Sequence, residues 1–308
     1  MAPISLTRPF RLIGELMNNS FARARRAWEA RSVAGYQELL RLQAGLGADY
    51  ATLYLGGTSS LQVAPAEMKA FLPDLVPALQ AAAALPISFD NPDVAFHREA
   101  LKHYDRARGP APILNSVAAS RTGLDEMVEL AARYDTLVFV MASERPLPGG
   151  GGAPCRTAAD IHTAAKHFVE MLVVRSGRTN DQIIIDPGLA PLASDLTGGV
   201  AMGLEAMRLI RADRDLAGVH LSVGLTNVSQ GTPREVRTAI EKAYLTVAVA
   251  AGLDFVLGNP EKGLELVAEA DPVLAGVREA LRVGRAGPGE SAEDAGMRQV
   301  EAIMELYR

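Results

Sequence analysis

Eight short apolar runs alternate with longer segments of helical periodicity, and this rhythm constrains the fold more than any other feature of the chain. The runs are rich in Val, Ile, Leu and Tyr, and Gly, Pro, Asn or Asp bounds them. They show little alternation with polar residues, which is typical of strands buried on both faces of a parallel sheet. The predicted strands are Phe10–Met17, Tyr50–Gly56, Pro86–Asp90, Pro112–Val117, Thr136–Ala142, Gln182–Asp186, Val219–Leu225 and Asp254–Gly258.

The intervening segments are predicted helices: Ala22–Leu46, Ala66–Ala84, Pro92–Tyr104, Leu124–Tyr134, Ala158–Ser176, Val200–Ala212 and Arg234–Ala251, with a short terminal helix at Ala292–Tyr307. Eight strand–helix units predict an α/β fold, a (β/α)8 TIM barrel in a single domain, and 308 residues suit that size. A dinucleotide-binding sheet is disfavoured, because Ile13-Gly14-Glu15 lacks the G-x-G-x-x-G fingerprint. We expect residues 1–285 to form the barrel and residues 286–308 to form a helical extension of the same domain.

Composition excludes several classes of site and partner. The single cysteine, Cys155, is too few for a disulfide framework, a cysteine-based zinc site or a four-cysteine iron–sulfur cluster within one chain. The net charge of −5, without a run of Lys or Arg, argues against nucleic-acid binding. The first ten residues do not resemble a signal peptide and no apolar run reaches membrane-spanning length, so we expect a cytoplasmic protein without a membrane partner.

Polar side chains recur where the predicted strands end. They are Glu15, Asn18, Asp90, Asn91, Asn115, Ser116, Asp186, Asn227, Ser229, Gln230 and Asn259. Chemistry in such barrels collects at this end, and carboxylates and amides suit the paired donors and acceptors of a flat polar heterocycle. No Lys, Cys or His joins the set, so neither an evident nucleophile nor a bound metal is expected.

Each of these residues could instead form a turn or cap a helix. Asp90 and Asn91 before Pro92, for example, also fit a helix cap followed by proline in the first turn. Their joint occurrence at one end of the barrel favours a site. The glycine run Gly149–Gly152, which follows Pro146-Leu147-Pro148, is interpreted as a mobile loop at the same mouth.

Several of these segments, in matching order, resemble the pterin-binding barrel family. They are Ile13-Gly14-Glu15-Leu16-Met17-Asn18, Ser88-Phe89-Asp90, Ile113-Leu114-Asn115-Ser116, Ile184-Ile185-Asp186-Pro187 and Gly224-Leu225-Thr226-Asn227-Val228-Ser229-Gln230. The most similar branch is that of the methyltetrahydrofolate:corrinoid/iron–sulfur protein methyltransferases, which is related to the folate domain of cobalamin-dependent methionine synthase. Ala250-Ala251-Gly252-Leu253-Asp254 also looks like that branch.

The resemblance implies roles for the matching positions. Asp90, Asn115 and Asp186 would hold the pterin ring, with Ser116 and Gln230 beside them, and Asn227 would face N5 as the catalytic residue. Glu15, Asn18 and Asn259 are further candidates.

The substrate would be tetrahydrofolate or methyl-tetrahydrofolate. A corrinoid (cobalamin) on a partner protein would supply the cobalt, and this chain would bind no metal. A homodimer is expected. No His or Glu lies beside Asn227 in the sequence, so the proton that N5 needs would come from solvent.

Two alternatives stay open. Dihydropteroate synthase, the sister branch, resembles this chain in fold and ring-binding residues, but it would show a late Ser-Arg pair where Thr226-Asn227-Val228-Ser229 stands. Its first loop would read Thr-Pro-Asp-Ser-Phe, not Met17-Asn18-Asn19-Ser20-Phe21. The second alternative is a non-catalytic pterin-binding subunit. The chain also departs from the methyltransferases, because Thr52-Leu53-Tyr54 stands where relatives end the second strand in Asp-Leu-Asn.

Overall fold

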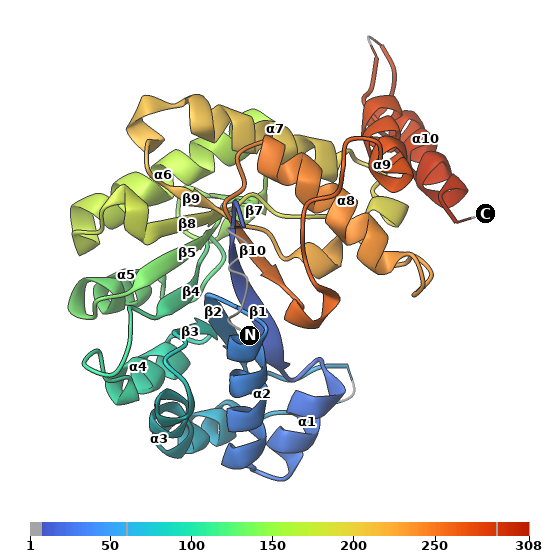
Figure 1. Ribbon diagram of the computed structural model, residues 1–308. Helices are drawn as coiled ribbons and strands as arrows, with labels where there is room; N and C mark the ends of the chain where they lie inside the picture. Colours follow the sequence, from blue (N-terminus) through green and yellow to red (C-terminus); the bar gives the residue numbers. More distant parts are fainter. Residues whose placement is uncertain (1–7, 60, 288, 308) are drawn as a thin grey trace.

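The computed structural model describes residues 8–59, 61–287 and 289–307, and its centre is a closed barrel of eight parallel strands (Figure 1). The strands follow the order β10–β1–β2–β3–β4–β5–β8–β9 around the barrel. A parallel bridge from Gly224 to Leu257 closes the gap between β9 and β10, and the Leu257 N–H donates to the Val223 carbonyl at 3.0 Å. The predicted single-domain (β/α)8 barrel is therefore confirmed.

The barrel strands correspond closely to the apolar runs of the sequence. They are β1 (Arg11–Asn18), β2 (Tyr50–Tyr54), β3 (Ile87–Asp90), β4 (Ile113–Val117), β5 (Leu137–Met141), β8 (Ile183–Asp186), β9 (His220–Leu221) and β10 (Phe255–Gly258). The seventh barrel strand, β9, is shorter than predicted, because the backbone leaves the ladder after Leu221 and enters the turn that holds Asn227.

The helices surround this barrel. They are α1 (Ala22–Glu29), α2 (Val33–Gly45), α3 (Pro65–Ala82), α4 (Val94–His103), α5 (Leu124–Arg133), α6 (Ala158–Ser176), α7 (Gly199–Ala212), α8 (Arg237–Ala250), α9 (Pro272–Val283) and α10 (Ala292–Glu305). Short 3₁₀ turns are η1 (Asn180–Gln182), η2 (Leu192–Ser194), η3 (Arg214–Leu216), η4 (Leu225–Asn227) and η5 (Pro260–Lys262). None of the helices in the described part of the chain has the length and apolarity needed to cross a membrane.

Two buried clusters make up the core. One fills the barrel lumen and consists of Ile13, Tyr50, Ile113, Phe139, Ile184 and Phe255. The other, much larger, lies between the outer face of the strands and the helices. Strands that bury both faces explain why the apolar runs showed no polar alternation.

Three local features differ from the sequence prediction. The segment predicted as one helix from Ala22 to Leu46 breaks at Arg31, which has a φ of 47°, and Ser32 caps a second helix by accepting from the Gly35 N–H at 3.1 Å. The glycine run is the tip of a β-hairpin formed by β6 (Glu144–Pro146) and β7 (Gly152–Pro154). Helix α9 was not predicted.

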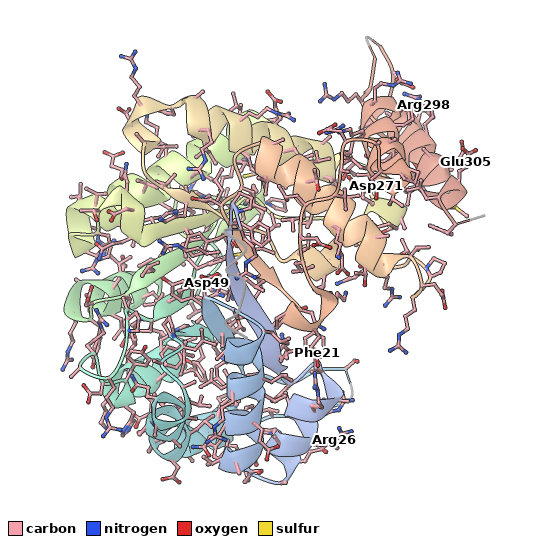
Figure 2. The ribbon with its side chains drawn as sticks, viewed as in Figure 1. Phe21, Arg26, Asp49, Asp271, Arg298 and Glu305 are labelled. Atoms are coloured by element: carbon pink, nitrogen blue, oxygen red, sulfur yellow. The ribbon has the colours of Figure 1, made fainter. Side chains whose placement is uncertain are left out.

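Helices α9 and α10 pack side by side at one edge of the barrel (Figure 1). Asp271 caps α9 by accepting from the N–H groups of Val273 and Leu274, and Figure 2 labels it together with Arg298 and Glu305 of α10. Residue 285, the predicted end of the barrel, lies between these two helices. The division into a barrel and an extension stays a prediction.

Candidate functional site

Asp90, Asn115 and Asp186 lie at or near the carboxyl ends of β3, β4 and β8, and we refer to them as the polar layer. Asp90 lies beside Asn115, and Met141 lies beside Asp186. Asn115 and Asp186 stand two positions after Ile113 and Ile184, which fill the lumen. Because successive side chains of a strand alternate between its faces, both residues point into the barrel, at its mouth.

The two aspartates of this layer have raised pKa values. Burial raises the pKa of Asp186 to about 7, against the opposing effect of the Gly188 N–H, which donates to its Oδ1 at 2.7 Å. Burial also raises the pKa of Asp90 to about 6, although Arg121 lowers it. Asp90 is half-buried, whereas Asp186 is 7% exposed. With this pKa, the Asp186 carboxyl is about half protonated at neutral pH.

This raised pKa predicts that the ligand-free protein loses stability as the pH rises from 6.5 to 8.0. The folded state holds the Asp186 proton up to about pH 7, whereas the unfolded chain releases it near the ordinary pKa of 3.8. Over this interval the loss from Asp186 is about 1 kcal/mol. Thermal unfolding of the wild type and of Asp186→Asn at both pH values checks this, because Asp90 and Glu15 titrate in both proteins. An identical pH dependence in the two proteins would contradict the burial of Asp186.

Neighbouring side chains fix Asn115 and Ser116. The Asn115 Nδ2 donates to Ser88 Oγ at 3.3 Å, and the Arg121 Nη2 donates to Ser116 Oγ at 3.0 Å. Arg121 lies in the loop between β4 and α5, and its positive charge lowers the pKa of Asp90. Arg121 was not among the predicted site residues, because it lies in a loop, five positions after Ser116 ends the motif.

Asn227 ends the 3₁₀ turn η4 at the mouth. Its backbone N–H donates to the Gly224 carbonyl at 3.1 Å, and its side-chain oxygen accepts from the Gln230 Nε2 at 2.9 Å. A β-carbon at position 224 would lie 3.1 Å from the Asn227 Nδ2, so glycine allows this close approach. Gln230 therefore orients the amide, whose oxygen still has a second lone pair for a ligand.

A buried carboxyl lies next to this turn. The Thr226 hydroxyl, one residue before Asn227, donates to Glu15 Oε2 at 3.3 Å, and Glu15 is 5% exposed. Burial raises the pKa of Glu15 to about 7, while Lys262 lowers it and Glu241 raises it. The expectation that no Glu accompanies Asn227 is corrected here, because barrel closure brings β1 beside the turn that follows β9.

Glu241 and Lys262 form an ion pair beneath the same turn. The Lys262 Nζ lies 2.6 and 2.7 Å from the two carboxylate oxygens of Glu241, which is 1% exposed. The Ser229 hydroxyl also donates to Glu241 at 2.6 Å. Ser229 therefore supports the turn from below. The sequence carried no signal for this pair, because its members come from α8 and η5.

The remaining polar strand-end residues make local contacts. The Asn18 Oδ1 accepts from the Ser20 N–H at 2.8 Å, and the Asn259 Oδ1 accepts from the Glu261 N–H at 2.9 Å as the cap of η5. The Asn91 Oδ1 accepts from the Asp93 N–H, and Asp93, not Asp90, caps α4. These contacts explain Asn91 as a structural residue, while roles of Asn18 and Asn259 towards a ligand stay predictions.

The hairpin β6–β7 follows β5 on the mouth side. Glu144 anchors it by accepting from the Ser120 N–H at 3.1 Å and the Ser120 hydroxyl at 2.7 Å. At the tip, Gly149, Gly150 and Gly151 have φ values of 96°, 99° and 80°, a region that favours glycine. Leu147, beside them, is 39% exposed. The expected loop is thus a hairpin with an anchored base and an exposed tip.

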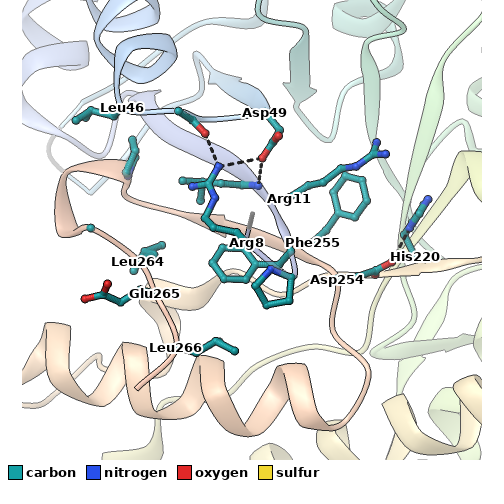
Figure 3. Close-up of a pocket in the computed structure, with 16 residues that line it drawn as sticks. Arg8, Arg11, Leu46, Asp49, His220, Asp254, Phe255, Leu264, Glu265 and Leu266 are labelled. Atoms are coloured by element: carbon teal, nitrogen blue, oxygen red, sulfur yellow. Dashed lines mark hydrogen bonds and ion pairs between the residues drawn. The ribbon is translucent and has the colours of Figure 1, made fainter. Parts of the chain in front are cut away.

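A cavity of about 1120 Å³ opens elsewhere, beside the start of β1 (Figure 3). Arg8 and Asp49 form an ion pair at 3.2 Å on one side of it, and the His220 Nδ1 lies within hydrogen-bond distance of the Asp254 Oδ2, at 2.7 Å, on another. Arg8 and Asp49 flank the amino-terminal end of the barrel, where polar residues generally serve stability instead of catalysis. The cavity is therefore separate from the layer of Asp90, Asn115 and Asp186.

Within residues 8–59, 61–287 and 289–307, no cluster of three or more His, Cys, Asp or Glu side chains has the arrangement of a metal site. The charged groups at the mouth are instead carboxylates, with Arg121 and Lys262 nearby.

Comparison with known proteins gives a family and a fold. A family model described as "Pterin binding enzyme" matches residues 55–257, which include Asp90, Asn115, Ser116, Asp186, Asn227 and Gln230. Among solved structures, the chain is similar to dihydropteroate synthase from Thermus thermophilus in complex with 6HMPPP, with 24% identity, 90% and 93% of the two chains covered and a TM-score of 0.54.

Two further solved structures share the fold. The 7,8-dihydropteroate synthase of Vibrio fischeri is 13% identical, with 84% and 90% of the chains covered and a TM-score of 0.60. The dihydropteroate synthase of Xanthomonas albilineans is 23% identical, with 91% and 93% covered and a TM-score of 0.56. At these identities the likeness establishes the barrel fold.

Proposed function

Because this chain belongs to the family of pterin-binding enzymes, we propose that it moves a methyl group between N5 of a tetrahydrofolate-type pterin and the cobalt of a corrinoid on a partner protein. The observation that carries the proposal is the Asn227 turn. It presents an amide oxygen, oriented by Gln230, at the mouth of a barrel whose rim holds Asp90, Asn115 and Asp186.

The rim supplies what a pterin ring needs. The amino group and N3–H of a pterin form a pair of donors, and an ionised carboxylate offers two acceptors. Asp186 and Asp90 occupy separate strands, so between them they can hold the donor edge, while Asn115 offers both a donor and an acceptor. The N–H donors of a bound pterin also stabilise the ionised form of these carboxylates. This stabilisation offsets the free-energy cost of burying their charge.

Methyl transfer needs a better leaving group than a neutral tertiary amine. A proton on N5 allows the electron pair of the breaking C–N bond to stay on N5, which leaves as a neutral N–H amine. The Asn227 oxygen can accept a hydrogen bond from that N–H and stabilise the positive charge on protonated N5, a charge that the resting pterin lacks. The corrinoid supplies, as Co(I), the nucleophile that receives the methyl group.

Glu15 offers a protein source for the proton. With a pKa of about 7, its carboxyl holds a proton about half of the time at neutral pH, and Thr226 connects it to the Asn227 turn. Its role would be to protonate N5 before the methyl group leaves and to recover the proton in the reverse direction.

Turnover tests the proposal directly. The protein is mixed with methyl-tetrahydrofolate and Co(I) cobalamin, or with methylcobalamin and tetrahydrofolate, and the cobalt absorption spectrum is followed. We expect methylcobalamin to form in the first mixture and to be consumed in the second, with Asn227→Ala as the slow control. An unchanged spectrum in both mixtures would refute the proposed reaction.

Dihydropteroate synthase activity is the second candidate, because the similar solved structures carry that name. The Thermus thermophilus enzyme described above is a complex with 6HMPPP, and a further structure of that enzyme is a complex with 4-aminobenzoate. Incubation of this protein with both compounds, followed by chromatography for dihydropteroate, distinguishes the candidates. Dihydropteroate formation without any cobalt chemistry would replace the first proposal, and binding of pterin without either reaction would indicate a non-catalytic subunit.

The β6–β7 hairpin is predicted to govern the corrinoid protein more than the pterin. Its tip is exposed on the mouth side, while its base is held by Glu144 against Ser120. Deleting Gly149–Gly151 should lower the rate with a protein-bound corrinoid on the order of tenfold, the size of one well-buried interface residue. The rate with free cobalamin should stay unchanged.

Val174→Ala is the matched control for this deletion. Val174 is 76% exposed near the end of α6, and helices of the barrel end on the side away from the mouth. Equal losses with protein-bound corrinoid and with free cobalamin would show that the hairpin serves the pterin site itself.

A further inference from the structure

The loop from β8 to α7, residues 187–198, connects two of the proposed pterin positions. It begins directly after Asp186, whose Oδ1 accepts from the Gly188 N–H at 2.7 Å. Further along, the Leu192 N–H donates to the Val228 carbonyl at 3.0 Å, next to Asn227. A displacement of this loop would therefore shift both Asp186 and the Asn227 turn.

The C-terminal helix α10 holds the far end of the same loop. Gln299 of α10 is fully buried, and its Nε2 lies 3.3 Å from the Asp195 Oδ2. Asp195 is itself buried and caps α7 by accepting from the N–H groups of Gly199 and Val200, each at 2.8 Å. The position of Asp195 thus depends on two helices that are distant in sequence.

Gly296 brings α10 against the loop backbone. A β-carbon built at Gly296 would lie 2.5 Å from the Leu196 Cα and 2.6 Å from its carbonyl carbon and oxygen. These are backbone atoms, so any larger residue at position 296 must move the loop or the helix. On its other side α10 is packed against α9, which in turn packs on α8 (Figure 1).

We infer that α10 is a positioning element of the pterin site, in which Gln299 and Gly296 fix the β8–α7 loop and thereby the places of Asp186 and Asn227. Neither residue touches the reacting atoms, so both are positioning residues. The inference rests on the pterin site of the proposed function, but not on the identity of the methyl acceptor.

The titration of Asp186 reports on the loop. The Gly188 N–H favours the ionised carboxylate, and burial opposes it. The Tyr244 hydroxyl of α8 also faces this site, since Asp186 contributes to raising the pKa of Tyr244. If the loop moves and the N–H is withdrawn, the pKa of Asp186 should rise further.

The test compares Gln299→Leu and Gly296→Val with Met297→Ala, a control on the same helix whose side chain is 48% exposed. Carboxyl ¹³C NMR of the ligand-free protein gives the Asp186 titration, which Asp186→Asn identifies. In both test variants we expect the midpoint to rise by about one pH unit, the effect of losing one N–H donor. Affinity for tetrahydrofolate at pH 7 should then fall about fivefold, because less of the carboxylate is ionised.

If Gln299→Leu has a native circular dichroism spectrum and an unchanged Asp186 titration midpoint, the inference is wrong. Helix α10 would then contribute only packing. Gln299→Leu also decides the matter if Gly296→Val does not fold, because it introduces no backbone clash. Should the wild type not bind tetrahydrofolate, the proposed function fails. The carboxyl titration still tests the role of α10 in that case.

Discussion

Replacing Asn227 with alanine is expected to lower the rate of methyl transfer by about 10²-fold while pterin affinity changes much less. In the proposed mechanism the amide oxygen would face the charge that develops at N5, and loss of one preorganised polar partner at such a position typically has this size. In the proposed site the ground-state pterin is neutral at N5, and Asp90, Asn115 and Asp186 would hold it at its other edge. Single-turnover rates and equilibrium titrations on the same variants measure the two effects.

Two further variants sharpen this prediction. Asn227→Asp should be milder than Asn227→Ala, because a carboxylate can still accept from the N5–H. Gln230→Ala removes the group that orients the amide, 2.9 Å from its oxygen, and should give a smaller loss of rate. If Asn227→Ala weakens binding and leaves the single-turnover rate intact, the residue is a ring clamp and the mechanism is wrong.

Replacing Asp186 with alanine is expected to weaken tetrahydrofolate binding by about 1.5–3 kcal/mol, the usual contribution of a charge-assisted hydrogen bond. The wild-type affinity should also depend on pH. Bound donors favour the ionised carboxylate, so affinity is highest above about pH 7 and falls as protonation of the free protein sets in below it. The loss approaches tenfold per pH unit below that midpoint.

Asp186→Asn is the control for the pH dependence, since its amide has nearly the same shape and does not titrate. Calorimetric titration with tetrahydrofolate between pH 5.5 and 8.5 should therefore show a flatter profile for the variant, with the remaining slope due to Asp90 and Glu15. Unchanged affinity in Asp186→Ala would remove Asp186 from the site and leave Asp90 as the carboxylate for the donor edge.

The sequence was informative about single strands and their ends. Runs such as Ile113–Val117 and Ile183–Asp186 predicted both the strand and the polar residue that closes it, because an apolar strand followed by a polar turn is a local pattern. The eightfold repetition of that pattern predicted the barrel. The order of strands then placed Asp90, Asn115 and Asp186 at one mouth, as observed.

Contacts between distant segments could not be predicted in this way. Glu15 and Thr226 are 211 positions apart, and Gln299 and Asp195 are 104 apart, so no local pattern links them. Helix α9 was missed, although Asp271 and Pro272 form a regular start for it.

The sequence by itself therefore determined the fold, the family and the polar rim, because strand periodicity and strand-end residues are properties of neighbouring positions. Only the tertiary structure decided the charge on that rim. Burial, which depends on everything packed around a carboxyl, raises the pKa values of Asp186 and Glu15 to about 7. Closure of the barrel set Glu15 beside the Asn227 turn, and packing of the last helix set the loop that joins Asp186 to it.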